Sequence, residues 1–238
     1  MGGPSAVYLA AMTSPYRDLD RLRPGALFAL LFTGPVLGGL LGAATNAVSA
    51  AVSPEYFRTV LGWHTVVDVW RAGIAQGVFE GILGGLGFAI VFTVLVGIIS
   101  KGCCPYALAL RYLLAVAAFA AGTWLLGGLV AIGLATLSPE FFRHAFQSVP
   151  VGTGPMLRYA WVGGSIWGIE LGGLAALVAG CVALGTRWRR LARTLPWQPG
   201  MQAEDRCPRC GYIVKGLSQP RCPECGTDLR DVGVQRGV

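Results

Sequence analysis

The 238-residue chain is 54% hydrophobic and 13% charged, whereas soluble domains carry about 25% charged residues, so an ordinary soluble domain is excluded. Its net charge of +7 is unevenly placed, because residues 25–185 hold six basic and five acidic residues and residues 186–238 hold ten basic and five acidic. The basic excess thus follows the last apolar segment. This argues against a nucleic-acid-binding surface, although it does not exclude nucleic acid as a partner.

Four apolar stretches are long enough to cross a membrane, which takes roughly 20 apolar residues. The first contains no charge between Arg23 and Glu55, and the second and fourth contain one glutamate each. A soluble chain this short could not enclose four such helices. We therefore predict an all-α membrane protein with a cytoplasmic N-terminal segment (1–24) and a transmembrane domain (25–186), in which the spans are about 26–52, 72–100, 112–137 and 159–185.

The Lys and Arg residues that flank the spans predict the orientation of the chain. The segment before span one, the loop between spans two and three, and the segment after span four hold nine of them, against four in the other two loops. Since cytoplasmic loops carry this excess, both termini are predicted to be cytoplasmic. Span one could instead be a cleaved signal peptide, since small residues near Ala50 suit cleavage, but its long charged leader argues that it is retained.

A six-residue segment occurs twice, and this predicts two tandem hairpin repeats. Ser53–Arg58 reads S-P-E-Y-F-R and Ser138–Arg143 reads S-P-E-F-F-R. Each copy follows an odd-numbered span and precedes a glycine-rich span with one glutamate, so the repeat is parallel. Serine as N-cap, proline in the first turn and glutamate near the helix N-terminus predict a short helix at the outer surface. We interpret the segment as structural rather than ligand-binding.

Three spans carry glycines at four-residue spacing. Residues four apart lie on one helix face, so each set lets a neighbouring backbone approach closely. We expect tight packing there, within the chain or between copies in a homo-oligomer. The helix-packing glycines are Gly34, Gly38 and Gly42 in span one, Gly73, Gly77, Gly81 and Gly85 in span two, and Gly164, Gly168 and Gly172 in span four.

Glu80 and Glu170 lie well inside spans two and four and form a candidate polar site with Gln76, one turn before Glu80. A carboxylate inside a membrane is costly, so each is expected to face protein or water. The two glutamates align at an offset of 90, close to the offset of 85 between the repeated segments. They either handle protons or cations as a pair, or are protonated and hydrogen-bond a neighbouring helix. The second interpretation is the simpler one.

Four cysteines near the C-terminus, Cys207, Cys210, Cys222 and Cys225, form the pattern C-x2-C-x11-C-x2-C with a glycine after each pair. Each C-x-x-C-G turn can present two thiolates to one metal ion. The pattern therefore predicts a closed, structural zinc site with four sulfur ligands. Iron in the same ligands is the main alternative, whereas disulfides are disfavoured in the cytoplasm.

The run C-P-R-C-G-Y-I-V-K-G-L-S-Q-P-R-C-P-E-C-G resembles the short zinc ribbon attached to many uncharacterised bacterial membrane proteins, notably in planctomycetes. Their usual form is close to C-x-x-C-G-Y-D-L-x-G-L followed by R-C-P-x-C-G. The resemblance is confined to this module and implies metal binding, but no activity. We expect a basic juxtamembrane linker (187–203), a zinc ribbon (204–230) with a short β-hairpin, and a tail (231–238), in the cytoplasmic (inner) membrane of a bacterium.

No nucleotide-binding loop, Ser/His/Asp pattern or His-rich metal site is present in the sequence. The first hypothesis is a membrane-anchored adaptor whose zinc ribbon binds a cytoplasmic protein, with lipid around the spans. The second is a small transporter or channel subunit that uses Glu80 and Glu170. An enzyme ranks third.

Overall fold

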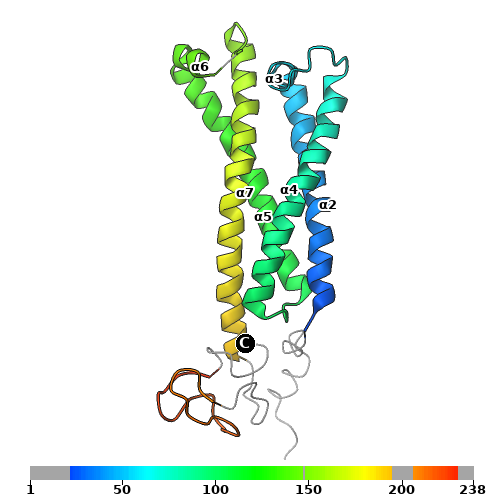
Figure 1. The fold of residues 1–238 in the computed structure, drawn as a ribbon. Helices are drawn as coiled ribbons and strands as arrows, with labels where there is room; N and C mark the ends of the chain where they lie inside the picture. The colour runs from blue at the N-terminus through cyan, green and yellow to red at the C-terminus, as the bar shows by residue number, and fades with distance from the viewer. Residues whose placement is uncertain (1–21, 147, 195–205, 230–238) are drawn as a thin grey trace, which may run out of the picture. The chain divides into compact units, whose positions relative to one another are not determined.

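The computed structural model describes residues 22–146, 148–194 and 206–229, and its described secondary structure is helical apart from isolated β-bridges. Four of the helices are long and apolar enough to cross a membrane, as the sequence predicts. In chain order the helices are α2 (Pro24–Val52), α3 (Pro54–Val60), α4 (Val69–Ser100), α5 (Tyr106–Leu137), α6 (Pro139–Ala145) and α7 (Thr153–Thr194) (Figure 1).

The long helices expose apolar side chains that a soluble protein would bury. Phe32 is 73% exposed, Leu129 63% and Val178 66%. Only 17–28% of the residues in each span are buried inside the structure. Surfaces of this kind are compatible with contact to the hydrocarbon of a bilayer, where helices satisfy their own backbone hydrogen bonds. The chain therefore has the architecture of a multi-pass membrane protein.

The helices extend somewhat beyond the predicted spans. α7 continues to Thr194, so the first part of the segment predicted as a linker (187–203) is helical. No proline or glycine interrupts residues 187–194, and straight-chain arginines favour a helix. Most of the predicted N-terminal segment (1–24), the remainder of the linker and all of the tail (231–238) lie outside the described residues.

The chain divides into two compact units. The first comprises Ala29–Phe92 and Leu110–Cys181. The second comprises Met1–Phe28, Thr93–Ala109 and Val182–Val238, of which the structure describes 22–28, 93–109, 182–194 and 206–229. Each unit is treated by itself below.

In the first unit, α2 and α4 pack through their glycines. A Cβ atom added at Gly38 would meet the carbonyl oxygen of Gly81, and one added at Gly34 would meet that of Gly85. Gly73 lies farther along the same face, and a Cβ atom added there would lie 2.9 Å from the Cβ of Ala50. Backbones in such close contact require glycine on both helices.

The glycines of α7 pack in the same way, against α5. Cβ atoms added at Gly164 and Gly168 would meet the carbonyl oxygens of Gly127 and Thr123, and one at Gly172 would meet the Thr123 side chain. All three predicted glycine sets are therefore occupied by contacts within the chain. These contacts agree with the first of the two expected uses, tight packing within the chain.

Both copies of the repeated segment form the predicted short helices, α3 and α6, which lie at the same end of the first unit (Figure 1). Phe57 in α3 and Phe142 in α6 are 2% and 6% exposed, and they pack against Ala50 and Ala135 respectively. Each segment thus anchors its helix by one buried aromatic ring.

The expected serine caps do not form. Ser53 and Ser138 precede α3 and α6 but make no side-chain capping hydrogen bond. Each has ψ near 85° (85° and 84°), a geometry in which the hydroxyl does not reach the N–H groups of the first turn. The Ser53 carbonyl instead accepts a hydrogen bond of 3.2 Å from the N–H of Tyr56. Proline and glutamate occupy the first turns as predicted.

In the second unit, a short loop joins α4 to α5. The N–H of Arg23 donates to the carbonyl of Gly102 at 2.8 Å, which fixes the start of α2 to this loop. Cys103 and Cys104 follow, with 3% and 2% of their surface exposed. Burial raises the pKa of the Cys104 thiol to about 11, which disfavours the reactive thiolate form of that side chain.

Candidate functional site

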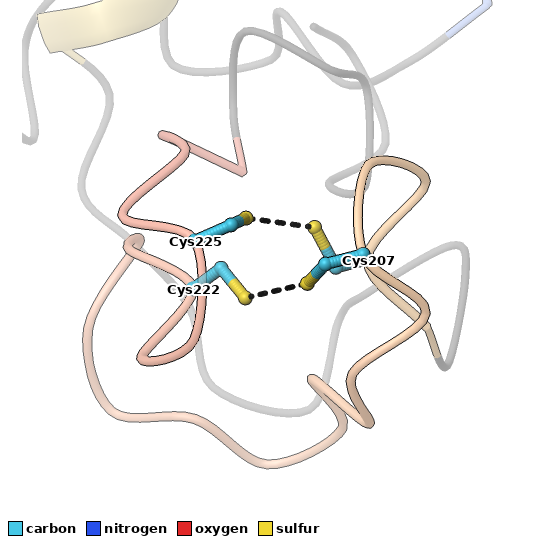
Figure 2. A group of neighbouring side chains, drawn as sticks. Cys207, Cys222 and Cys225 are labelled. Carbon is cyan, nitrogen blue, oxygen red and sulfur yellow. Dashed lines mark hydrogen bonds between the residues drawn. The ribbon is translucent and has the colours of Figure 1, made fainter.

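The four cysteines of the C-terminal module converge on one point. The Sγ atoms of Cys207, Cys210, Cys222 and Cys225 all lie within 4.8 Å of one another. Cys207 and Cys222 are buried and Cys210 is exposed, so the cluster lies at the edge of the module. Figure 2 shows the sulfurs of Cys207, Cys222 and Cys225 directed toward one another from the two turns.

The distances between these sulfurs match those of a tetrahedral metal site. Sγ of Cys207 lies 3.7 Å from that of Cys225, and Sγ of Cys210 lies 3.5 Å from that of Cys222. Four sulfurs about 2.3 Å from a central zinc ion are about 3.8 Å apart. A disulfide requires about 2.05 Å, and the four cysteines are free thiols. The cluster could therefore hold one metal ion with no open position.

The two C-x-x-C-G turns have the same backbone structure. Within the first, the N–H of Gly211 donates to the carbonyl of Cys207 at 2.8 Å, and within the second that of Gly226 donates to Cys222 at 2.9 Å. Gly211 and Gly226 have φ values of +75° and +67°. A residue with a Cβ atom is strained in this region, which accounts for glycine after each cysteine pair.

The module differs from the prediction in its β-structure. In residues 206–229 the antiparallel contacts are two isolated bridges, one joining Arg206 to Ile213 and the other joining Arg221 to Asp228. Each bridge closes one cysteine turn, so pairing occurs within the turns instead of in the expected β-hairpin. A turn follows Tyr212–Val214, with Gly216 at φ +79°.

A very small hydrophobic core supports the sulfurs. Val214 and Leu229, each 0% exposed, pack with Cys207 and Cys222. A core of this size contributes little to folding, because small modules bury too little apolar surface to be stable alone. The free energy of metal binding would therefore supply most of the stability of residues 206–229.

The surroundings of the sulfurs favour ionisation at one of them. The side chain and backbone N–H of Thr227 stabilise the thiolate of Cys225 and lower its pKa to about 6. The Cys225 sulfur lies 3.1 Å from the Thr227 hydroxyl oxygen. The Tyr212 backbone N–H acts similarly on Cys210, but burial and the neighbouring sulfurs outweigh it and raise the pKa of that thiol to about 12.

The predicted polar residues of the spans line a cavity of about 570 Å³ in the first unit. Residues of α2, α3, α4, α5 and α7 form its wall. Gln76, Glu80 and Glu170 all contribute, so the structure brings together the predicted intramembrane site. Glycines of the α2–α4 contact, including Gly38 and Gly81, form part of the same wall.

Within the described part of the chain, no hydrogen bond joins either glutamate to a neighbouring helix, whereas the simpler interpretation expected one. The Gln76 side-chain amide donates to the Glu80 carboxylate at 2.6 Å, one turn away on the same helix. Both glutamates are exposed to the cavity rather than enclosed by packing. Among the described residues, no ion pair involves either carboxylate. The expectation that each carboxylate faces protein or water agrees with this geometry.

Tyr56 is a further member of the site that the sequence did not single out. It belongs to the repeated segment, yet its ring lines the cavity and lies 5.1 Å from the ring of Tyr159 on α7. Burial raises the pKa of Tyr56, and the charges of Tyr159 and Glu170 raise it further. The second copy of the segment has Phe141 where the first has Tyr56. This single difference between the copies was the available signal in the sequence.

The two glutamates do not occupy equivalent places in the helix packing. The contact between Gly42 and Gly77 corresponds to that between Gly127 and Gly164, which gives an offset of 87 between α4 and α7. Glu80 therefore corresponds to Trp167, and Glu170 lies three residues farther, about 4.5 Å along a helix. The separation of 90 residues between the two glutamates therefore differs from the offset of 87 that relates the two helices. The carboxylates are staggered along the cavity.

Comparison with known proteins leaves the geometry as the basis for assigning a function. No family model matches the chain, and no curated protein or solved structure matches it either.

Proposed function

We propose that the chain is a multi-pass protein of a bacterial cytoplasmic membrane whose C-terminal zinc ribbon binds a cytoplasmic protein partner. The observation that carries the metal site is the convergence of four cysteine sulfurs within 4.8 Å. Zinc is proposed over iron because four thiolates in a closed tetrahedral arrangement are the usual ligands of structural zinc. The resemblance of residues 207–226 to bacterial zinc ribbons supports the same reading. The excess of Lys and Arg at the terminal flanks supports the proposal that both termini are cytoplasmic.

The partner surface is proposed on the first cysteine turn. Tyr212 and Ile213 are 38% and 58% exposed although both are large and apolar, and Arg209 beside them is exposed and basic. Exposed aromatic and aliphatic side chains next to arginine are typical of protein-binding surfaces. An acidic protein segment with apolar residues has the complementary chemistry.

Affinity purification of the full chain from mild detergent tests this proposal. The variant Tyr212→Ser with Ile213→Ser should lose its partner while keeping its metal, because neither residue is a ligand. The variant Cys207→Ser with Cys222→Ser should lose both metal and partner. Recovery of the same partner with the Tyr212/Ile213 variant would contradict the proposed surface.

The cavity favours a second candidate function, a small transporter or channel subunit. Two carboxylates, Glu80 and Glu170, line one cavity between the spans, and intramembrane carboxylates commonly mark ion or proton paths. Reconstituted protein should then show cation flux that Glu80→Gln with Glu170→Gln abolishes. Unchanged flux in that variant would refute this candidate.

We also propose that the chain arose by duplication of one helical hairpin. The identical spacing of 85 between Ala50 and Ala135, Phe57 and Phe142, and Gly42 and Gly127 supports this, because each pair makes corresponding contacts. The test is exchange of α3 residues 53–58 for 138–143, which should preserve folding.

A further inference from the structure

The cavity between the spans has the size and chemistry of a site for a small organic molecule. Its volume of about 570 Å³ falls within the range of about 300–1,000 Å³ typical of small-molecule pockets. Glycine and aliphatic residues make up most of its lining. Such a surface favours a largely apolar ligand, because glycine and aliphatic side chains offer water few hydrogen-bonding groups.

The charge of the cavity is unbalanced. Glu80 and Glu170 both line it, and among the described lining residues there is no Lys, Arg or His. Among the described residues, the one hydrogen bond to either carboxylate is donated to Glu80 by the Gln76 side-chain amide, a neutral group. Carboxylates at this depth are costly without a positive partner. A cationic ligand would supply the missing charge.

Aromatic rings add to the preference for a cation. Tyr56, Phe88 and Trp124 line the same cavity as the two carboxylates. The face of an aromatic ring attracts an ammonium-type cation within about 6 Å. Trp124 is held by an edge-to-face contact with Trp161, with ring centroids 4.9 Å apart, so its orientation is fixed before any ligand arrives.

A bare divalent metal ion does not suit the cavity. Ca²⁺ and Mg²⁺ take six or more oxygen ligands, and protein zinc sites supply at least three His, Cys or carboxylate ligands. Among the described residues, the cysteine cluster is the one group of three or more metal-binding side chains brought together, and it lies elsewhere in the chain. Two carboxylates in a mainly apolar wall match a single positive charge surrounded by hydrocarbon.

We propose that this cavity binds a hydrophobic organic monocation of the quaternary ammonium or phosphonium class. The charge lies near Glu80 and Glu170, and the hydrocarbon groups contact the aromatic and glycine-rich wall. The inference deepens the second candidate function by naming its ligand class and rests on the same site. Binding itself requires no transport, so the two can be tested separately.

Binding of tetraphenylphosphonium and tetraphenylborate to the full chain in mild detergent provides the test. The two ions have nearly the same shape and opposite charge, so hydrophobic partitioning affects both. We expect saturable binding of the cation alone. Glu80→Gln and Glu170→Gln should each weaken it roughly tenfold, as loss of a charged partner does. The control Glu140→Gln, in α6 and outside the cavity, should leave it unchanged.

A second pair of variants tests the location without altering charge. Gly84 lines the cavity and Gly87 does not, and a Cβ atom added at either meets no other atom within 4 Å. Gly84→Phe should therefore fill the cavity and abolish cation binding, whereas Gly87→Phe should preserve it. Thermal unfolding of both proteins establishes that they are folded.

Each outcome decides between the proposals. The inference would be overturned if both ions bound equally or if the cation did not bind. It would also be overturned if cation binding survived Gly84→Phe in a folded protein. Flux of small inorganic cations without tetraphenylphosphonium binding would overturn it and leave the transporter candidate standing. Saturable, charge-dependent binding without flux in proteoliposomes would support the inference and refute the transporter.

Discussion

Gly42 on α2 and Gly77 on α4 approach so closely that the carbonyl oxygen of each lies where a Cβ atom of the other would be. Neither position can accept a side chain unless the helices separate. This contact joins the first hairpin and also borders the cavity, since both glycines belong to its wall. Helix packing and the proposed ligand site therefore depend on the same residues.

We predict that Gly77→Ala destabilises the protein by about 1–3 kcal/mol, as overpacking of a close contact generally does. The matched control is Gly84→Ala on the same helix, where an added Cβ meets nothing within 4 Å. That change should be neutral or slightly stabilising, because alanine favours helix over glycine by up to about 1 kcal/mol. Thermal unfolding in detergent compares the two. Equal midpoints would show that the contact is not tight.

The second hairpin offers an independent prediction. An added Cβ at Gly164 would meet the Cβ of Ala131 and the carbonyl oxygen of Gly127, whereas one at Gly122 on α5 meets nothing within 4 Å. Gly164→Ala should therefore lower the unfolding midpoint, and Gly122→Ala should not. If both variants behave alike, α5 and α7 do not pack in the observed register.

Neighbouring phenylalanines in α6 provide a test of the short helices. Phe142 is 6% exposed and packs against Ala135 and Met156, whereas Phe141 is 69% exposed. Phe142→Ala should destabilise the protein by about 3–5 kcal/mol through loss of buried surface and the cavity left behind. Phe141→Ala should change stability by less than about 0.5 kcal/mol. A larger loss at Phe141 would contradict the orientation of α6.

In the cysteine module, Gly226→Ala should weaken metal binding several-fold. Gly226 has φ +67°, and an alanine there is strained by about 1–2 kcal/mol. The strain acts on the metal site because the Gly226 N–H donates to the carbonyl of Cys222. Competition with a chromogenic chelator measures the change. Unaltered affinity would show that the turn does not position the ligands.

Much of the fold could be predicted from the sequence because single residues have strong effects in a membrane. The four spans could be predicted from their uninterrupted apolar length. Glycines such as Gly38 and Gly81 indicated which helix faces are in close contact, although not which helices they contact. The structure confirms four membrane-competent helices and the convergence of the cysteines. The partner face of α5 was less accessible, because its residues Thr123, Gly127 and Ala131 lie four apart but only one of the three is a glycine.

The cavity could not be predicted for a different reason. Its wall combines residues of five helices, so no local pattern reports it. Tyr56 appeared to be part of a structural repeat, and its contact with Tyr159 arises only when α3 packs beside α7. The places of Glu80 and Glu170 in the helix packing could not be predicted for the same reason, because helix register depends on contacts between backbones rather than on matching residue types.

The metal content of the full chain, measured by native mass spectrometry after purification in mild detergent, tests the central claim most directly. We predict one zinc ion per chain, lost in Cys207→Ser with Cys222→Ser. It should be retained in Cys181→Ser, because Cys181 lies in α7 and outside the cluster. A folded chain without metal, or zinc that persists after both ligand substitutions, would contradict a four-cysteine metal site.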